Sequence, residues 1–229
     1  MASTGEDGTA TSIDPARPIS ISSAIPKPQL DTLLDGIGYI HAHCVLHDGT
    51  LATYLPPLSY SKLRRFWDNN LAQVDQGQRH IVVQLMPVSS RTNSIAEVVF
   101  AADSSKPVSA PSLNINNVEY EVAGVMSLHM PESETGPFRG LVEKVFTSPN
   151  HRRKGIMRTV MRELERLARQ DGRWSLLLDT TVGTDAEGVY PRLGYTRMGE
   201  INAYGISPKT GEYVDEVWYW KDLRGATEL

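Results

Sequence analysis

One amphipathic helix, predicted over residues 153–170, most constrains how this chain can fold. Apolar residues recur on one face of it at helical spacing, arginine and glutamate fill the other face, and Asp171-Gly172 mark its end. The apolar run 140–147 precedes it and is typical of a strand. A strand, a short polar turn and an amphipathic helix in this order indicate a domain in which helices pack on a sheet.

The remaining elements follow from periodicity and turn residues. Further helices are predicted over 30–47 and 59–76, and a short one over 184–193. Apolar runs predict more strands, at residues 80–86, 96–102, 121–130, 174–179, 195–204 and 212–223. This order predicts an α/β fold with a mixed sheet and helices on both faces.

Two segments are expected to lie outside the regular elements. Residues 1–29 are rich in Ser, Thr, Gly and Pro, and we expect a mostly flexible tail with one strand near residues 19–25. The polar stretch 103–117 is predicted to be a loop insertion. Residues 30–229 are then expected to form a single domain.

Composition limits the class of protein. The net charge is -4 and the pI is about 5.9, which argues against a nucleic-acid partner because such proteins usually carry a basic face. Cys44 is the only cysteine, so no intramolecular disulfide can form. The chain has no run of 18 apolar residues and no signal-peptide-like start, so no membrane partner is expected. We expect a cytoplasmic protein that binds a small molecule.

The turn between the strand and the helix has the character of a phosphate site. The first turn of a helix offers unpaired N–H groups and a partial positive charge, both suited to a pyrophosphate. Gly155 lets a ligand approach the backbone, and Arg152, Arg153, Lys154 and Arg158 add positive charge. Taken alone, the same run also suits a solvated basic turn or a targeting patch.

The surrounding sequence resembles the GNAT acetyltransferase superfamily. Residues 152–157, Arg-Arg-Lys-Gly-Ile-Met, resemble its motif Arg/Gln-x-x-Gly-x-Gly/Ala, from which Met157 departs. The resemblance continues through Leu-Asp-Thr at 178–180 and Tyr-Pro-Arg-Leu-Gly-Tyr-Thr-Arg-Met-Gly-Glu at 190–200. With Tyr-Trp-Lys-Asp-Leu at 219–223, it is most similar to tabtoxin-resistance acetyltransferases, and it covers residues 140–223.

This resemblance implies a GNAT-like, mostly antiparallel mixed sheet and acetyl-CoA as cofactor. It implies that the strand end pairs with the pantetheine arm and that an N–H there polarises the thioester. The predicted cofactor-binding residues are those of the strand end and the basic turn: Val145, Phe146, Thr147, Arg152, Arg153, Lys154, Gly155, Ile156, Met157 and Arg158.

Three residues are candidates for catalysis. Tyr190 occupies a position where the superfamily often has a tyrosine near the sulfur, and its phenol could protonate the thiolate; the alternative is a buried structural aromatic. The tabtoxin-resistance type has a glutamate where this chain has Leu141. Glu143 lies on the same strand face and is either the base or an ordinary charged residue. Asp179 matches an aspartate implicated in substrate handling, or else caps the following loop.

Leu141, Glu200 and Tyr204 are predicted to line the acceptor pocket. The cluster His41, His43, Cys44 and His47 consists of zinc-ligand types, but no second ligand group follows at a recognised spacing. We therefore expect no metal there and predict a wall of the substrate pocket instead.

The predicted activity is transfer of an acetyl group to an amine or a hydroxyl of a small molecule, such as a toxin or a secondary metabolite. We expect a monomer or homodimer. Two alternatives stay open: an enzyme of the same fold that acetylates protein N-termini or lysines, and a catalytically silent acyl-CoA-binding module, which the absent glutamate at Leu141 suggests.

Overall fold

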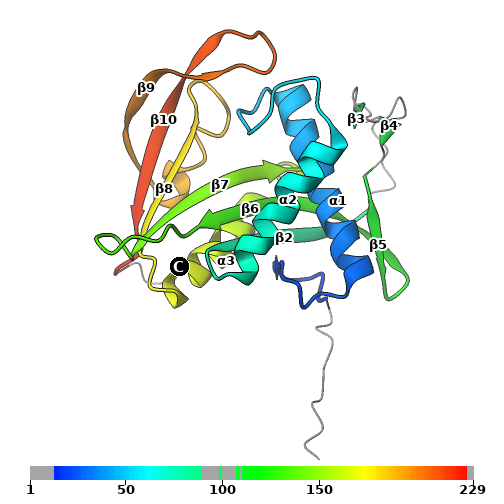
Figure 1. The fold of residues 1–229 in the computed structure, drawn as a ribbon. Coiled ribbons are helices and arrows are strands. Elements are labelled where there is room, and N and C mark those ends of the chain that lie inside the picture. Colours follow the sequence, from blue (N-terminus) through cyan, green and yellow to red (C-terminus); the bar gives the residue numbers. More distant parts are fainter. Residues whose placement is uncertain (1–12, 89–97, 100–106, 109, 226–229) are drawn as a thin grey trace, which may run out of the picture.

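A twisted sheet of eight strands runs through the centre of the molecule (Figure 1). The computed structural model describes residues 13–88, 98–99, 107–108 and 110–225. The strand order is β1-β2-β6-β7-β8-β10-β9, with β5 paired to β6 beside this path. Only the pair β7–β8 is parallel, and all other neighbours in the sheet are antiparallel.

The strands of this sheet differ widely in length. Their bounds are β1 Ile19–Ser20, β2 Arg79–Pro87, β5 Ser112–Ile115, β6 Val118–His129, β7 Arg139–Thr147, β8 Ser175–Thr181, β9 Thr196–Ile206 and β10 Tyr213–Asp222. A separate pair joins β3 (Val98–Val99) to β4 (Pro107–Val108). The mixed, mostly antiparallel sheet predicted from the sequence is confirmed.

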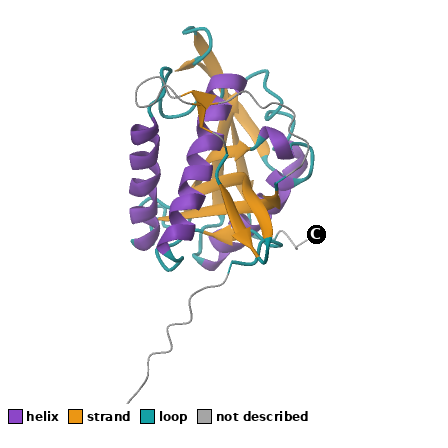
Figure 2. Cartoon of the chain, turned by 90° about the vertical axis from the view of Figure 1, so that its right-hand side faces the viewer, coloured by secondary structure: helices purple, strands orange, loops and turns teal. Residues whose placement is uncertain are grey.

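Helices cover both faces of the sheet (Figure 2). Helices α1 (Lys27–His43) and α2 (Tyr60–Asp75) pack on one face, and α3 (Ile156–Gln170) packs on the other. Alternate residues of β2 enter the two cores: Val83 lies in the α1–α2 core and Val82 in the α3 core. The period-two pattern of this strand therefore builds two separate apolar layers.

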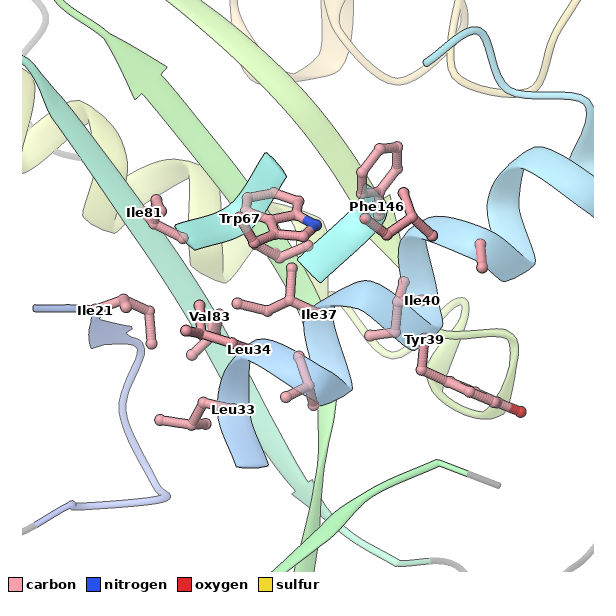
Figure 3. Packing of buried hydrophobic residues seen from close by; sticks show 14 of the residues in the cluster. Ile21, Leu33, Leu34, Ile37, Tyr39, Ile40, Trp67, Ile81, Val83 and Phe146 are labelled. Carbon is pink, nitrogen blue, oxygen red and sulfur yellow. The ribbon is translucent and has the colours of Figure 1, made fainter. Parts of the chain in front are cut away.

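Close packing explains a glycine inside α1. A Cβ at Gly36 would lie 2.7 Å from Val122 Cγ2 on β6, so the helix reaches the sheet only because this side chain is absent. Trp67 of α2 is fully buried in the same core, which also contains Ile37 and Phe146 (Figure 3). Glycine is unfavourable inside a helix, but at position 36 it allows α1 to pack closely against the sheet.

The helix predicted over 30–47 differs at both ends. It begins earlier, at Lys27, with Pro28 in its first turn, where the missing N–H costs nothing. After His43 the chain widens into a π-helical turn, η1 (Cys44–Asp48), which Gly49 ends with φ +75°. Single π turns are often found at functional sites, and this one borders the cavity described below.

The prediction of a short helix over 184–193 is wrong. The structure has a series of turns there, with only a 3₁₀ turn, η3 (Pro191–Leu193). Gly183 and Gly194 adopt φ of +80° and +84°, and Pro191 cannot donate a helical hydrogen bond. These residues outweigh the weak apolar periodicity.

The loop predicted over 103–117 is also partly wrong, because Ser112–Ile115 form β5 against β6. The strand predicted over 96–102 lies mostly outside the described residues, within which β3 covers 98–99.

Residues 1–12 of the expected tail also lie outside the described residues. From residue 13 on, the chain contains β1, and Ile21 and Ile25 are buried in the α1–α2 core. None of the helices within the described residues has the length and apolar character needed to cross a membrane.

Candidate active site

Strands β7 and β8 are neighbours in the sheet and separate along their length (Figure 1). Residues of both strands line a cavity. They pair only from Arg139–Leu141 to Ser175–Leu177, over three residue pairs. Beyond this point lies a cavity of about 1130 Å³, lined by residues 142–147 of β7 and 179–181 of β8. The edges of two central strands therefore face a ligand space instead of each other.

A bulge in β7 accounts for the separation. Phe146 lies opposite Val125 of β6, whereas Glu143 lies opposite Ser127, so Lys144 and Val145 together face a single residue. Lys144 adopts φ +54°, a left-handed conformation that is uncommon for this residue type. The bend turns the end of β7 away from β8 and leaves backbone groups of β7 available to an extended ligand.

The basic turn after β7 brings the start of α3 to the wall of the cavity. A 3₁₀ turn, η2 (Pro149–His151), leads to Arg153 with φ +60° and to Gly155 with φ +79°. Gly155 is the N-cap of α3, and no side chain caps this helix. Gly155, Ile156, Met157 and Arg158 all line the cavity. The unpaired N–H groups of the first turn are thus free to bind an anion.

Buried contacts hold this loop in place. His151 is 1% exposed, and its Nε2 lies 2.7 Å from Glu121 Oε1. Asn150 donates to the same oxygen at 3.1 Å. A Cβ at Gly124 would lie 2.6 Å from Ile156 Cγ2, so the missing side chain lets α3 start close to the sheet. None of these supports was predicted, because Glu121 and Gly124 lie on β6, far from the loop in sequence.

The predicted cationic residues do not all face the cavity. Arg152, Arg153 and Arg158 line it, whereas Lys154 does not and lies with its Nζ 3.2 Å from His151 Nδ1. Arg152 pairs with Asp48 at the end of η1. The strand-end residues Val145, Phe146 and Thr147 line the cavity as well. Nine of the ten predicted cofactor-binding residues therefore surround one space.

Two carboxyl groups share the wall of the cavity near β8. Asp179 and Glu216 lie diagonally on the same face of the β8–β10 pair, because Trp218 lies opposite Asp179 and Glu216 opposite Thr181. Burial and the neighbouring Asp179 raise the pKa of Glu216 to about 8. Burial also raises the pKa of Asp179, while the hydrogen bond with Glu216 and the charge of Lys144 act in the opposite direction.

These shifts give the site a carboxyl pair that holds one proton near neutral pH, because two like charges in a buried place are costly. Glu216 was not predicted. Its only sequence signal is an acidic residue in an aromatic strand, and the pairing with Asp179 depends on a register that the sequence does not reveal.

Tyr190 lies just before η3, and its ring packs against Tyr195 and Tyr219. It is 3% exposed and lines the cavity. Burial, followed by the charge of Asp179, raises the pKa of its phenol above the ordinary value. The hydroxyl therefore keeps its proton at all physiological pH values and can serve as a donor.

The remaining predicted catalytic and acceptor-pocket residues do not share one environment. Glu143 lines the cavity, but its Oε2 accepts a hydrogen bond from Arg79 at 2.8 Å. Leu141 belongs to the last β7–β8 pair and does not line the cavity. Glu200 and Tyr204 lie on β9 outside the cavity; Glu200 pairs with Arg197, and Tyr204 packs against Trp218.

The histidine cluster is divided between core and cavity. His41 is fully buried and stacks on Phe146 with a centroid distance of 4.7 Å, and burial lowers its pKa to about 3. Cys44 and His47 line the cavity, and their predicted place in a substrate-pocket wall stays a prediction. In the part of the chain that the structure describes, no three His, Cys, Asp or Glu side chains gather in a group that could hold a metal ion.

Comparison with known proteins agrees with this geometry. A family model described as the acetyltransferase (GNAT) family matches residues 95–195. An N-acetyltransferase from Staphylococcus aureus Mu50 has 13% identity and a TM-score of 0.58, with 91% of this chain and 99% of that chain covered.

Two further structures share the fold at 16% identity and a TM-score of 0.57. One is yncA from Salmonella typhimurium with its cofactor acetyl-CoA, covering 92% of this chain and 96% of that chain. The other is a ribosomal-protein-alanine N-acetyltransferase from Brucella melitensis, covering 90% and 99%. At these identities the likeness establishes the GNAT fold. The tabtoxin-resistance subtype is not among the features that these comparisons identify.

Two glycines at opposite ends of α3 test the phosphate site. Gly155 and Gly172 both have φ above +65°, and a Cβ at either would meet no described atom within 4 Å. Valine at either position should cost similar stability, since left-handed backbone is unfavourable for β-branched residues. Only Gly155→Val places a side chain at the anion site, so calorimetry should show acetyl-CoA affinity reduced by roughly 100-fold or more there and by about twofold or less in Gly172→Val. Equal affinities in the two variants would contradict the assignment.

Proposed function

We propose that the protein acetylates an amine of a small molecule with acetyl-CoA, because residues 95–195 match the model of the acetyltransferase (GNAT) family and the chain has the GNAT fold. One observation supports this proposal most directly. Strands β7 and β8 separate after three residue pairs, and the uncapped N-terminus of α3 lines the cavity beyond them. A toxin or a secondary metabolite is the kind of acceptor that the resemblance over residues 140–223 favours, and a hydroxyl acceptor is compatible with the same site.

The cavity suits acetyl-CoA along its length. The N–H groups at the start of α3, with Arg152, Arg153 and Arg158, match a pyrophosphate, and the freed edge of β7 matches the amides of the pantetheine arm. Such an arm would bring the acetyl group to the bulge at Lys144 and Val145. Asp179, Glu216 and Tyr190 line the cavity at the neighbouring strand and turn.

Acetyl-CoA supplies an activated thioester, and the chain supplies the proton transfers. The acceptor ammonium gives a proton to the Asp179–Glu216 pair, and its nitrogen then bonds to the acetyl carbon as the carbon–sulfur bond breaks. A backbone N–H of the bulge donates a hydrogen bond to the thioester oxygen. Tyr190 Oη donates its proton to the departing sulfur. The second proton, which the nitrogen loses as the amide forms, passes to the Tyr190 oxygen and restores the phenol.

Contacts across the acceptor side support a compact acceptor. Thr50, Leu51 and Lys209 line the cavity, and they come from the segment after η1 and from the β9–β10 connection. A Cβ at Gly205 would lie 2.2 Å from Leu51 Cδ1, and one at Gly49 would lie 3.1 Å from Lys209 Cδ. These two segments therefore touch, which leaves less room for a protein substrate than an open groove would.

A thiol-release screen with acetyl-CoA tests the proposed acceptor class. Small amines, amino acids and hydroxylated metabolites should be compared with peptides that have free N-termini or lysines. We expect turnover with at least one class of small amine and none with the peptides. Preferred turnover of peptides would assign the protein acetyltransferase function instead, and acetyl-CoA binding without any turnover would indicate a silent binding module.

Tyr190→Phe tests the proton donor. Loss of the phenolic proton should reduce kcat by roughly 100-fold, the lower end of what general acid catalysis contributes, with acetyl-CoA affinity changed by less than about threefold. Tyr195→Phe is the matched control, because Tyr195 is equally buried but donates to Met161 Sδ and does not line the cavity. Similar kcat values for the two variants would show that Tyr190 is a structural aromatic.

Glu216→Gln tests the carboxyl pair through pH. A base must be ionised, so kcat/KM should rise with pH through the range in which the pair loses its shared proton, near pH 8 for Glu216. Glutamine removes the carboxyl group that titrates near pH 8 and leaves Asp179 as the base, so the midpoint near pH 8 should be lost from the profile. The exposed Glu212→Gln should leave the midpoint unchanged. An unmoved midpoint in Glu216→Gln would exclude the pair as the base.

A further inference from the structure

A buried arginine ties four elements together next to the bulge. Arg79 of β2 is 6% exposed and donates to three oxygen atoms: Nε to Gln73 Oε1 of α2 at 2.7 Å, Nη1 to Ser127 Oγ of β6 at 2.5 Å and Nη1 to Glu143 Oε2 of β7 at 2.8 Å. A buried guanidinium requires such partners, because an unpaired one would be very costly. Its position is therefore strongly determined.

The hydrogen bonds of Arg79 reach the residue pair that flanks the bulge on one side. Ser127 and Glu143 lie opposite each other in the β6–β7 register, and both accept from Arg79. On the other side of the bulge, Phe146 is 3% exposed and stacks against His41 of α1. Lys144 and Val145 thus protrude between two fixed points.

The backbone at the bulge needs this support. Lys144 has φ +54°, which costs free energy for a residue with a Cβ and persists only where the surroundings enforce it. Within the described residues, the ammonium of Lys144 has no ion-pair partner within 4.0 Å, and it lies over the ring of Phe66, 5.8 Å from the centroid. The closer contacts are those of the flanking residues, and among them the Arg79 network is the polar one.

We propose that Arg79 is a positioning residue for the transfer reaction, which holds the β7 bulge through Glu143 so that its backbone N–H groups face the thioester oxygen. This inference rests on the proposed acetyl transfer. It also gives Glu143 a role different from that of a base: its Oε2 serves as the fixed acceptor of a buried guanidinium, and proton transfer is left to Asp179 and Glu216.

Two substitutions at Glu143 separate positioning from base catalysis. Glutamine retains an oxygen that can accept from Arg79 but cannot take up the acceptor proton, whereas leucine removes both. If Glu143 positions the bulge, Glu143→Gln keeps kcat within about threefold of the wild type, while Glu143→Leu and Arg79→Met lose roughly 100-fold or more, the usual effect of misplacing an oxyanion donor. Free coenzyme A should lose much less affinity than kcat loses in Glu143→Leu and Arg79→Met, because the phosphate loop is untouched and only the pairing of the pantetheine arm with β7 is disturbed.

Arg64→Met is the control for a purely structural effect. Arg64 also bonds to three partners, Asp31, Asp35 and Asp68, but it joins α1 to α2 away from β7. Its loss should lower the melting temperature without lowering kcat below about a third of the wild-type value.

Amide hydrogen exchange measures the bulge without relying on turnover. At a temperature where all variants are folded, exchange of the amides that pair β6 with β7 on either side of the bulge should accelerate about tenfold or more in Arg79→Met and Glu143→Leu, and remain unchanged in Arg64→Met. Unchanged exchange in both network variants would overturn the inference, as would equal loss of kcat in Glu143→Gln and Glu143→Leu. A wild-type protein that binds acetyl-CoA but acetylates nothing would refute the proposed function, and the exchange experiment would still decide whether Arg79 holds the bulge.

Discussion

The loss of pairing between β7 and β8 after three residue pairs is the constraint on which the rest of the site depends. A central strand edge normally has all its backbone groups paired, because buried unpaired N–H and C=O groups are costly. Here the edge of β7 is left open by a bulge in its own chain and faces a cavity. The fold therefore carries a backbone binding capacity that an extended, amide-containing ligand can satisfy, and this is the shape of the pantetheine arm.

Those parts of the site that lie on contiguous residues could be predicted from the sequence. The periodic apolar face of α3 and the run Arg152 to Gly155 need no long-range information, because helix period, helix-end charge and glycine permissiveness are local properties. The mixed sheet was predictable from the order of apolar runs. The helix predicted over 184–193 is absent for a local reason as well, because glycines and a proline outweigh the weak apolar periodicity of this segment.

Those parts that depend on register or on close approach could not be predicted. Asp179 and Glu216 meet only because β10 lies between β8 and β9 with a particular alignment, and no pattern in either strand encodes that alignment. In the sequence, Arg79 is indistinguishable from a surface arginine at the start of a strand. Its role becomes visible only in the structure, where Gln73, Ser127 and Glu143 accept its hydrogen bonds. Strand parity predicts a face for Glu143, and Glu143 lines the cavity, but parity gives no information on what a carboxylate bonds to.

The charges along the cavity explain how one space can both hold a polyanion and keep a carboxyl proton. Positive charge lies at one end, on Arg152, Arg153 and Arg158 and on the start of α3, and the acidic pair lies at the other. If the arginines stood beside Asp179 and Glu216, they would favour the ionised carboxylates and lower both pKa values. Among the residues that the structure describes, Lys144 is the cation that lowers the pKa values of both carboxyl groups, and burial outweighs it. Distance along β7 therefore lets the strand end bind anionic groups while the wall of β8 and β10 retains a proton.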